Sequence, residues 1–193
     1  MTITQKTCAA PALDRREILR YAGARFADEA LDRLLDDCLD EALPVLTYKV
    51  CSLRAPISIV GSSVVFASLS FTSAALAKNL NGCGEAVLFA ATVGLGIDRL
   101  IARYKSLSPS KSLMLQAIGA ERIESLCDTF CDGLEAEGMK LRPRFSPGYG
   151  DLDISCQRGI FDLLGCEKRI GVTLNGSMLM SPSKSVTAIV GIL

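Results

Sequence analysis

The sequence predicts an α+β fold: a single domain with a mostly antiparallel, twisted sheet flanked by helices. Segments with period-two alternation occur beside segments with helical periodicity, and the two kinds do not alternate regularly as they do around a parallel sheet. Residues 86–91 form a continuous apolar run of strand length, which is typical of a strand buried on both faces. The chain has 193 residues, 49% of them hydrophobic, which suffices for one domain core.

Strands are expected wherever short segments alternate at period two or are continuously apolar. The expected strands are 57–60, 64–71, 86–91, 170–174 and 185–192. The first two form a hairpin that turns near Gly61–Ser63. Residues 55–77 contain no charge and are long enough to span a bilayer, but their many Ser and Thr residues and their alternation favour strands. We therefore expect no membrane span.

Helices are expected where a capping residue precedes an apolar stripe at helical spacing. They begin after Asp14, Asp28, Thr72 or Ser73, and Ser108, and a further short helix is expected from Ser155 to Leu164. The last four of these helices end, in chain order, at Pro44, Gly82, Gly138 and Gly165. The longest runs from Ser108-Pro109 to Gly138 and places Glu121, Ser125, Asp128, Asp132 and Glu135 opposite its buried face. Residues 141–153 are a loop rich in Pro and Gly, residues 1–13 are an N-terminal tail, and residues 14–193 form the domain.

Composition excludes several classes of function. Lys and Arg total 21 and Asp and Glu total 21, so no net positive charge attracts nucleic acid. Histidine is absent, which excludes Ser-His-Asp triads and histidine-ligated metal sites. The eight cysteines include no C-x-x-C pair, and the N-terminus does not resemble a secretory signal. We therefore expect a cytoplasmic protein whose thiols are reduced and carry no metal.

The loop 141–153 is the stretch that most favours ligand binding. Its prolines and glycines restrict the backbone, and they hold Arg144 five residues from Tyr149. Such a loop can present a guanidinium group to a carboxylate, backbone groups to a heterocycle and an aromatic ring to the same ligand.

These residues carry a family resemblance. Arg144-Phe-Ser-Pro-Gly148-Tyr149 fits the R-x-x-x-G-Y motif of the S-adenosylmethionine-binding reactivation domain of cobalamin-dependent methionine synthase. The segments 170–174, 180–182 and 185–188 resemble the C-terminal part of the same family in order and spacing, and similarity to its short, stand-alone members extends from about residue 14 to the end.

The resemblance implies a site for S-adenosylmethionine. Arg144 is expected to face the methionine carboxylate, Ser146 and its neighbour Gly148 to offer backbone groups to the adenine, and Tyr149 to line the pocket. Glu124 matches a family acid that meets the ligand ammonium group. The family's acidic contact near its N-terminus has no counterpart in residues 1–50, and Ile189-Val190-Gly191 replaces its C-terminal aromatic contact.

The implied function is to position the methyl donor for reductive methylation of cob(II)alamin. The cobalamin is carried by a partner, a methionine synthase or a related corrinoid protein, and a flavodoxin-like or ferredoxin-like protein donates the electron. One alternative is a partner or activator of another corrinoid methyltransferase, with or without S-adenosylmethionine binding. A thiol enzyme and a purely structural role are further alternatives.

Overall fold

The computed structural model describes residues 2–24 and 28–193 and shows a mixed α+β domain. The strands are β1 (Thr4–Thr7), β2 (Lys49–Val60), β3 (Ser63–Phe66), β4 (Leu69–Thr72), β5 (Glu85–Thr92), β6 (Thr173–Leu174), β7 (Met180–Ser181) and β8 (Ser185–Ile192). The helices are α1 (Arg15–Tyr21), α2 (Glu29–Ala42), α3 (Ala74–Asn79), α4 (Gly96–Leu107), α5 (Pro109–Ala136), α6 (Cys156–Leu164) and α7 (Cys166–Ile170), with a 3₁₀ turn at Leu43–Val45.

The main sheet is antiparallel throughout, with strand order β4-β3-β2-β5-β8. The long strand β2 changes neighbour along its length: Lys49–Ser52 pair with β1, and Ile57–Val60 pair with β3. Strand β1 is therefore the sixth strand of this sheet, paired with β2 alone. Strands β6 and β7 pair only with each other, as a separate two-stranded ribbon.

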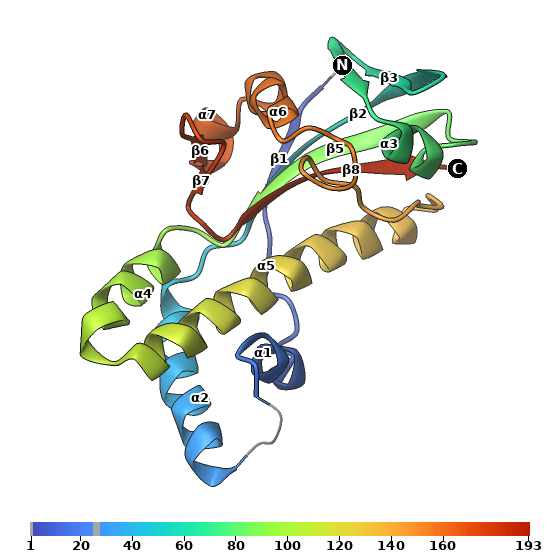
Figure 1. The fold of residues 1–193 in the computed structure, drawn as a ribbon. Coiled ribbons are helices and arrows are strands. Elements are labelled where there is room, and N and C mark those ends of the chain that lie inside the picture. Colours follow the sequence, from blue (N-terminus) through green and yellow to red (C-terminus); the bar gives the residue numbers. More distant parts are fainter. Residues whose placement is uncertain (1, 25–27) are drawn as a thin grey trace.

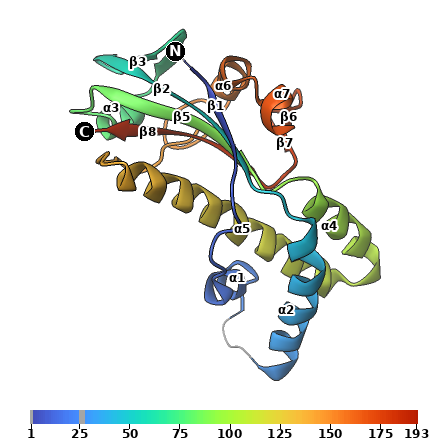
Figure 2. The same cartoon turned by 180° about the vertical axis from the view of Figure 1, so that it is seen from behind.

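Helices cover both faces of this curved sheet (Figures 1 and 2). Helix α5 runs across one face, and α3, α6 and α7 lie over the other. Strand β5 is therefore buried on both sides: Val87 and Phe89 face α5, whereas Ala86 and Leu88 face α6 and α7. This confirms the prediction from the continuous apolar run.

Helices α1, α2 and α4 pack around the N-terminal half of α5, away from the sheet (Figure 1).

The prediction that Glu121 lies on an exposed polar face of α5 is wrong. Glu121 is buried, with 2% of its surface exposed, and so is its neighbour Arg122, with 1% exposed. Arg122 Nε donates to Glu121 Oε2 over 2.5 Å. The pair is buried because residues 11–14 cross over it: Arg122 donates to the carbonyl oxygen of Pro11 at 2.9 Å, and Glu121 Oε1 accepts from Asp14 N–H at 3.1 Å.

Two strand predictions are wrong in detail. Residues 64–71 are two strands, because a turn with Ala67 at a φ of +51° separates β3 from β4. Residues 170–174 lie mostly outside any strand: Cys166–Ile170 is helix α7, and only Thr173–Leu174 are extended. Gly171, with a φ of +73°, ends that helix, since glycine adopts this left-handed conformation at little cost.

Several structured segments lie outside the predicted elements, among them the short strand β7 and the 3₁₀ turn. Thr4–Thr7 form β1 within residues 1–13, of which Met1 lies outside the described residues. The first half of β2 and the whole of α4 were also not predicted. The capped starts of α1, α2, α3 and α5 are confirmed, with side chains of Asp14, Asp28, Ser73 and Ser108 accepting from backbone N–H groups.

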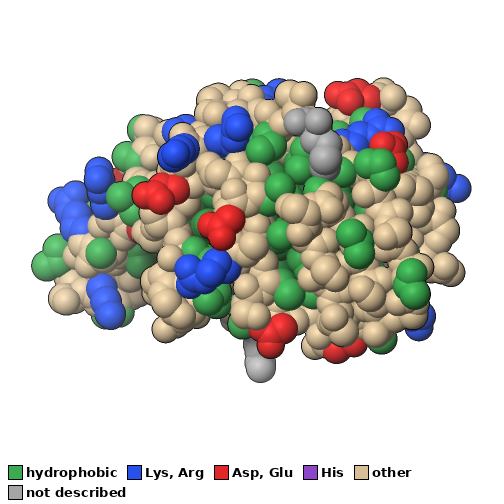
Figure 3. Space-filling view, turned by 90° about the horizontal axis from the view of Figure 1, so that it is seen from above, with side chains coloured by type: hydrophobic (Ala, Val, Ile, Leu, Met, Phe, Trp, Pro, Cys, Tyr) green, Lys and Arg blue, Asp and Glu red, His purple; other side chains and the backbone are tan. Residues whose placement is uncertain are grey.

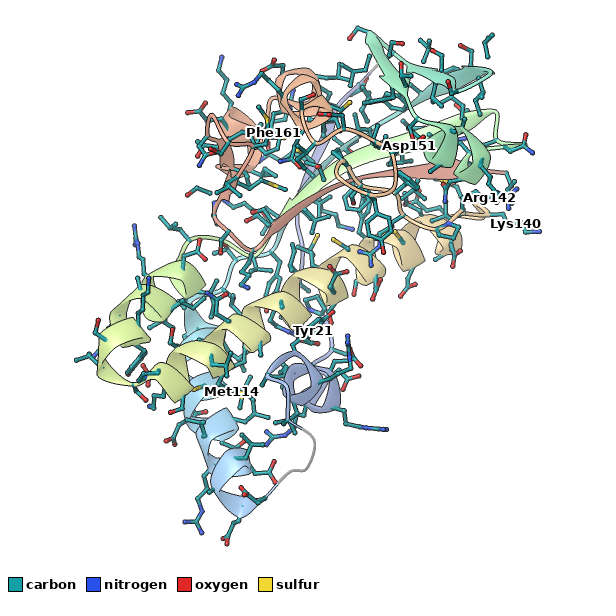
Figure 4. The ribbon with its side chains drawn as sticks, in the orientation of Figure 1. Tyr21, Met114, Lys140, Arg142, Asp151 and Phe161 are labelled. Carbon is teal, nitrogen blue, oxygen red and sulfur yellow. The ribbon has the colours of Figure 1, made fainter. Side chains whose placement is uncertain are left out.

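The loop 141–153 is fastened to two elements. On one side, Phe145 and Ile189 of β8 exchange backbone hydrogen bonds of 2.9 and 2.8 Å. On the other, the Asp151 carboxylate accepts the N–H groups of Ala74 and Ala75 at 2.8 and 3.1 Å, and the Ser73 hydroxyl also donates to it. Figure 4 shows Asp151 beside α3. The loop is thus held between the sheet edge and the start of α3.

The surface carries both signs of charge. On the face shown in Figure 3, acidic and basic side chains are spread among uncharged ones. Within residues 2–24 and 28–193, no helix has the length and apolar character needed to cross a membrane.

The buried pair yields a stability prediction. Arg122→Met should lower the free energy of unfolding by about 3–5 kcal/mol, because it leaves the Glu121 carboxylate buried without its cation. Urea denaturation measures the change. The double variant Glu121→Leu with Arg122→Met should lose less, since no lone charge remains. A single-variant loss below about 1 kcal/mol would show that solvent reaches the pair.

The Asp151 contacts yield a pH prediction. Hydrogen bonds from Ser73, Ala74 and Ala75 hold the pKa of Asp151 below its ordinary value of 3.8. A carboxyl with a lowered folded pKa stabilises the fold above the unfolded pKa, and this contribution is lost as the pH falls through the folded pKa. Asp151→Asn should therefore be less stable than wild type at pH 6, and the difference should shrink toward pH 3. Asp40→Asn, on the exposed side of α2, should show no such pattern in urea titrations at several pH values.

Candidate functional site

Arg144 lies between the outer edge of β8 and helix α5. One of its terminal nitrogens, Nη2, is 3.0 Å from Glu124 Oε2 and 2.9 Å from Asp128 Oδ1. The two acids stand one helical turn apart on α5, so both reach the same guanidinium group. The Arg144 side chain is 25% exposed, and those of Glu124 and Asp128 are 44% and 65% exposed. Solvent and ligands therefore have access to this cluster.

A cavity of about 360 Å³ opens beside this cluster. Its lining residues are Glu124, Arg144, Ser146, Tyr149, Val186 and Ala188. Four of the five residues predicted to bind ligand therefore border one cavity, between α5, the loop 141–153 and β8. The cavity places one cation, Arg144, and one carboxylate, Glu124, around one space, a combination suited to a small zwitterionic ligand.

Gly148 lies outside that lining and shapes the loop instead. Its φ is +86°, and a side-chain carbon placed on it would lie 3.2 Å from Ile154 Cδ1. Gly148 N–H donates to the Leu152 carbonyl oxygen at 2.8 Å, and Tyr149 N–H donates to the Ser146 carbonyl oxygen at 3.1 Å. The motif glycine is thus required by a tight turn that presents Tyr149.

Tyr149 is largely exposed, at 72%, and its ring packs edge-on against Phe145 at 6.1 Å between centroids. Phe145 is the residue that pairs with β8. The exposed aromatic ring is therefore held at the mouth of the cavity by a residue that is part of the sheet edge.

A second cavity, of about 450 Å³, shares Ser146 and Val186 with the first. Its other walls come from α6 and from the β6–β7 ribbon, including Gln157, Met178 and Met180. Gln157 is buried; its Nε2 donates to the Met178 carbonyl oxygen at 2.9 Å, and its Oε1 accepts from the Thr187 hydroxyl at 3.3 Å. The two cavities form adjoining parts of one groove along β8.

The roles of Asp128 and Gln157 at the site were not predicted. The exposed position predicted for Asp128 is confirmed, with 65% of its side chain exposed, but its spacing of four residues from Glu124 also lets both acids meet one partner. Gln157 lies on the apolar face of α6 with Ile160, Phe161 and Leu164. The helical spacing of these residues therefore indicates that the Gln157 side chain is buried and needs hydrogen-bond partners.

The thiols are poorly suited to nucleophilic catalysis. All eight cysteines are free in the structure. Burial raises the pKa of Cys127 to about 12 and that of Cys131 to about 11, which keeps both protonated. A hydrogen bond from Cys166 lowers the pKa of Cys51, but both side chains are fully buried. Among the described residues, no three His, Cys, Asp or Glu side chains are grouped as a metal site.

The comparisons with known proteins rest on structure. No protein-family model matches the sequence, and no curated protein matches it. The fold is similar to the crystal structure of the MetH reactivation domain bound to AdoHcy, with a TM-score of 0.68 and 16% sequence identity. The match covers 99% of this chain and 78% of that chain. The chain therefore has the fold of the MetH reactivation domain.

Proposed function

We propose that this protein binds S-adenosylmethionine in the groove along β8 and positions it for reductive methylation of cob(II)alamin on a partner protein. The observation that carries the proposal is the cavity in which Arg144, Glu124, Ser146 and Tyr149 meet. The fold shared with a reactivation domain that binds AdoHcy supports it, as does the R-x-x-x-G-Y motif at 144–149.

The amino-acid end of the ligand is assigned to the Arg144 cavity. A ligand carboxylate would take the guanidinium donors now shared by Glu124 and Asp128, through a charge-assisted hydrogen bond. The released Glu124 carboxylate would then accept the ligand ammonium group. The ligand carboxylate and ammonium group thus replace contacts that Arg144 and Glu124 now make with each other.

The nucleoside end is assigned to the adjoining cavity. Ser146 and Val186 border both spaces, so a ligand that starts at Arg144 reaches Gln157 and Met178 along β8 without a break. Backbone groups near Ser146 supply hydrogen bonds to the adenine, and the methionine side chains of the ribbon supply an adaptable apolar wall.

The partner surface is assigned to the rim of this groove. Tyr149, Ile154 and Leu179 are large apolar residues at or next to the cavities, and they are 72%, 43% and 65% exposed. Exposed apolar residues around a ligand groove are typical of a surface that another protein covers. A methionine synthase or related corrinoid protein would cover it and bring its cobalamin to the methyl group.

The chemistry of the bound groups needs no catalytic side chain from this protein. A flavodoxin-like or ferredoxin-like donor supplies one electron to cob(II)alamin, and transfer of the methyl group leaves S-adenosylhomocysteine. This chain contributes the orientation of the methyl donor. Eight free cysteines support a reducing cytoplasmic location.

Arg144 provides the first test. Arg144→Ala should weaken S-adenosylmethionine binding by about ten- to a hundredfold, because a charge-assisted hydrogen bond contributes on the order of 1.5–3 kcal/mol. Arg144→Lys should restore little of this loss, since an ammonium group cannot make the forked pair. Isothermal titration calorimetry measures each affinity.

Arg142 is the matched control. Its Nη2 donates to the Asn81 carbonyl oxygen at 2.9 Å, near the C-terminal end of α5 (Figure 4). Arg142→Gln keeps a donor there and should change affinity by less than about threefold. Equal losses at both arginines would show that the loop attracts anions without a specific site. Wild type that binds no S-adenosylmethionine at millimolar concentration would favour an activator of another corrinoid methyltransferase.

Asp128 provides a test in the opposite direction. Asp128→Asn removes one acid that competes for Arg144, so S-adenosylhomocysteine should bind about two- to fivefold more tightly, the scale of an exposed ion pair. S-adenosylhomocysteine is used because its sulfur is neutral, so the Asp128 carboxylate does not attract it as it would attract the sulfonium group of S-adenosylmethionine. Asp132→Asn, one turn further along the same helix, should leave the affinity unchanged. Weaker binding by Asp128→Asn would mean that Asp128 holds the ligand directly.

A further inference from the structure

Helix α5 separates the groove along β8 from another cavity on its opposite flank. This cavity, of about 770 Å³, lies between the C-terminal half of α5 and the strands β1 and β2. Leu126, Phe130 and Gly133 of α5 face it, whereas Glu124 and Asp128 face Arg144. At 100° per residue, positions 124 and 126 point to opposite sides of the helix.

The cavity forms because the sheet is wider than the helix that covers it. Phe130 packs on Phe89 of β5 at 4.8 Å between ring centroids, so α5 lies over the centre of the sheet. Val50 and Ser52 of β2 and the paired strand β1 extend beyond it. At Gly133, a side-chain carbon would meet nothing within 4 Å. The cavity volume falls within the range of small-molecule sites.

The walls have an apolar middle, and the charged residues that line the cavity are Lys6, Arg54 and Glu137. Leu126, Phe130, Leu134 and Met139 line the middle. At the far end, Arg54 is already paired with Glu85. At the near end, Lys6 is paired with Val50 across the strands and therefore lies on the cavity face. Among the described residues Lys6 takes part in no ion pair, and Cys8 lies near it.

We propose that this cavity binds an amphipathic carboxylate, such as a fatty acid, with its carboxylate at Lys6 and its hydrocarbon body between Leu126, Phe130 and Leu134. At its own end of the cavity, Lys6 favours an anion over a cation, and the apolar middle favours a hydrocarbon body. Each buried methylene adds to the affinity through the hydrophobic effect. The site is independent of the groove along β8.

The experiment titrates the full chain with decanoate and with decylammonium, both below their micelle concentrations, by calorimetry. Wild type should bind one decanoate with a Kd below about 1 mM, and decylammonium at least threefold more weakly. Decanoate should also slow alkylation of Cys8, which lines the cavity, as read by mass spectrometry of its peptide. No binding at 5 mM, or equal binding of the cation, would overturn the proposal.

Three variants locate the ligand. Gly133→Leu fills the cavity and should abolish decanoate binding, while thermal unfolding shows an unchanged or raised Tm, because glycine is unfavourable inside a helix. Lys6→Gln should weaken decanoate binding about threefold and should not weaken decylammonium binding, because it removes a positive charge. Lys49→Gln is the matched control, since Lys49 lies one position before Val50 and therefore on the other face of β2. Full decanoate affinity in a folded Gly133→Leu protein would contradict the proposal, whatever the result for S-adenosylmethionine.

Discussion

The buried ion pair of Glu121 and Arg122 is the interaction on which the arrangement around α5 depends. Two neighbouring charges in a helix cannot be buried unless other groups satisfy them. Residues 11–14 do so with two carbonyl oxygens and one N–H group. The same contacts carry the chain from β1 into α1 and fix both on one flank of α5. The opposite flank remains free for the groove along β8.

A single helix thus divides two chemical environments. On one side, α5 presents carboxylates to an arginine at the sheet edge; on the other, it presents apolar side chains to a space above β2. The separation follows from helical geometry, because residues two positions apart point in nearly opposite directions. A rigid helix held at its N-terminal half by the buried pair keeps both environments in place.

Local signals predicted much of this fold. Side-chain caps at Asp14, Asp28 and Ser73 fixed helix starts, because the capping hydrogen bond is made within one turn. The strand at 170–174 was wrong because a short alternation of Ile, Val and Leu fits a helix end equally well, and Gly171 decided between them. Strand β1 is exposed along its whole length, so it carries no apolar pattern to find.

The candidate site was only partly visible in the sequence. The motif at 144–149 located the loop, but the ion pairs of Arg144 with Glu124 and Asp128 join positions up to twenty residues apart. Such pairing depends on how α5 crosses the sheet. The burial of Glu121 was missed for the same reason: the helix period places it among exposed acids, and only the path of residues 11–14 covers it.

The pairing of Phe145 with Ile189 has a consequence for aggregation. Strand β8 is the last strand of the sheet on its side, and an unprotected edge strand is a template for pairing with another chain. The bridges at Ile189 and Ile192 occupy part of that edge with the protein's own loop. A loop kept in place for ligand binding therefore also shields the sheet, and its detachment would expose the protein to strand-mediated self-association before the core itself unfolds.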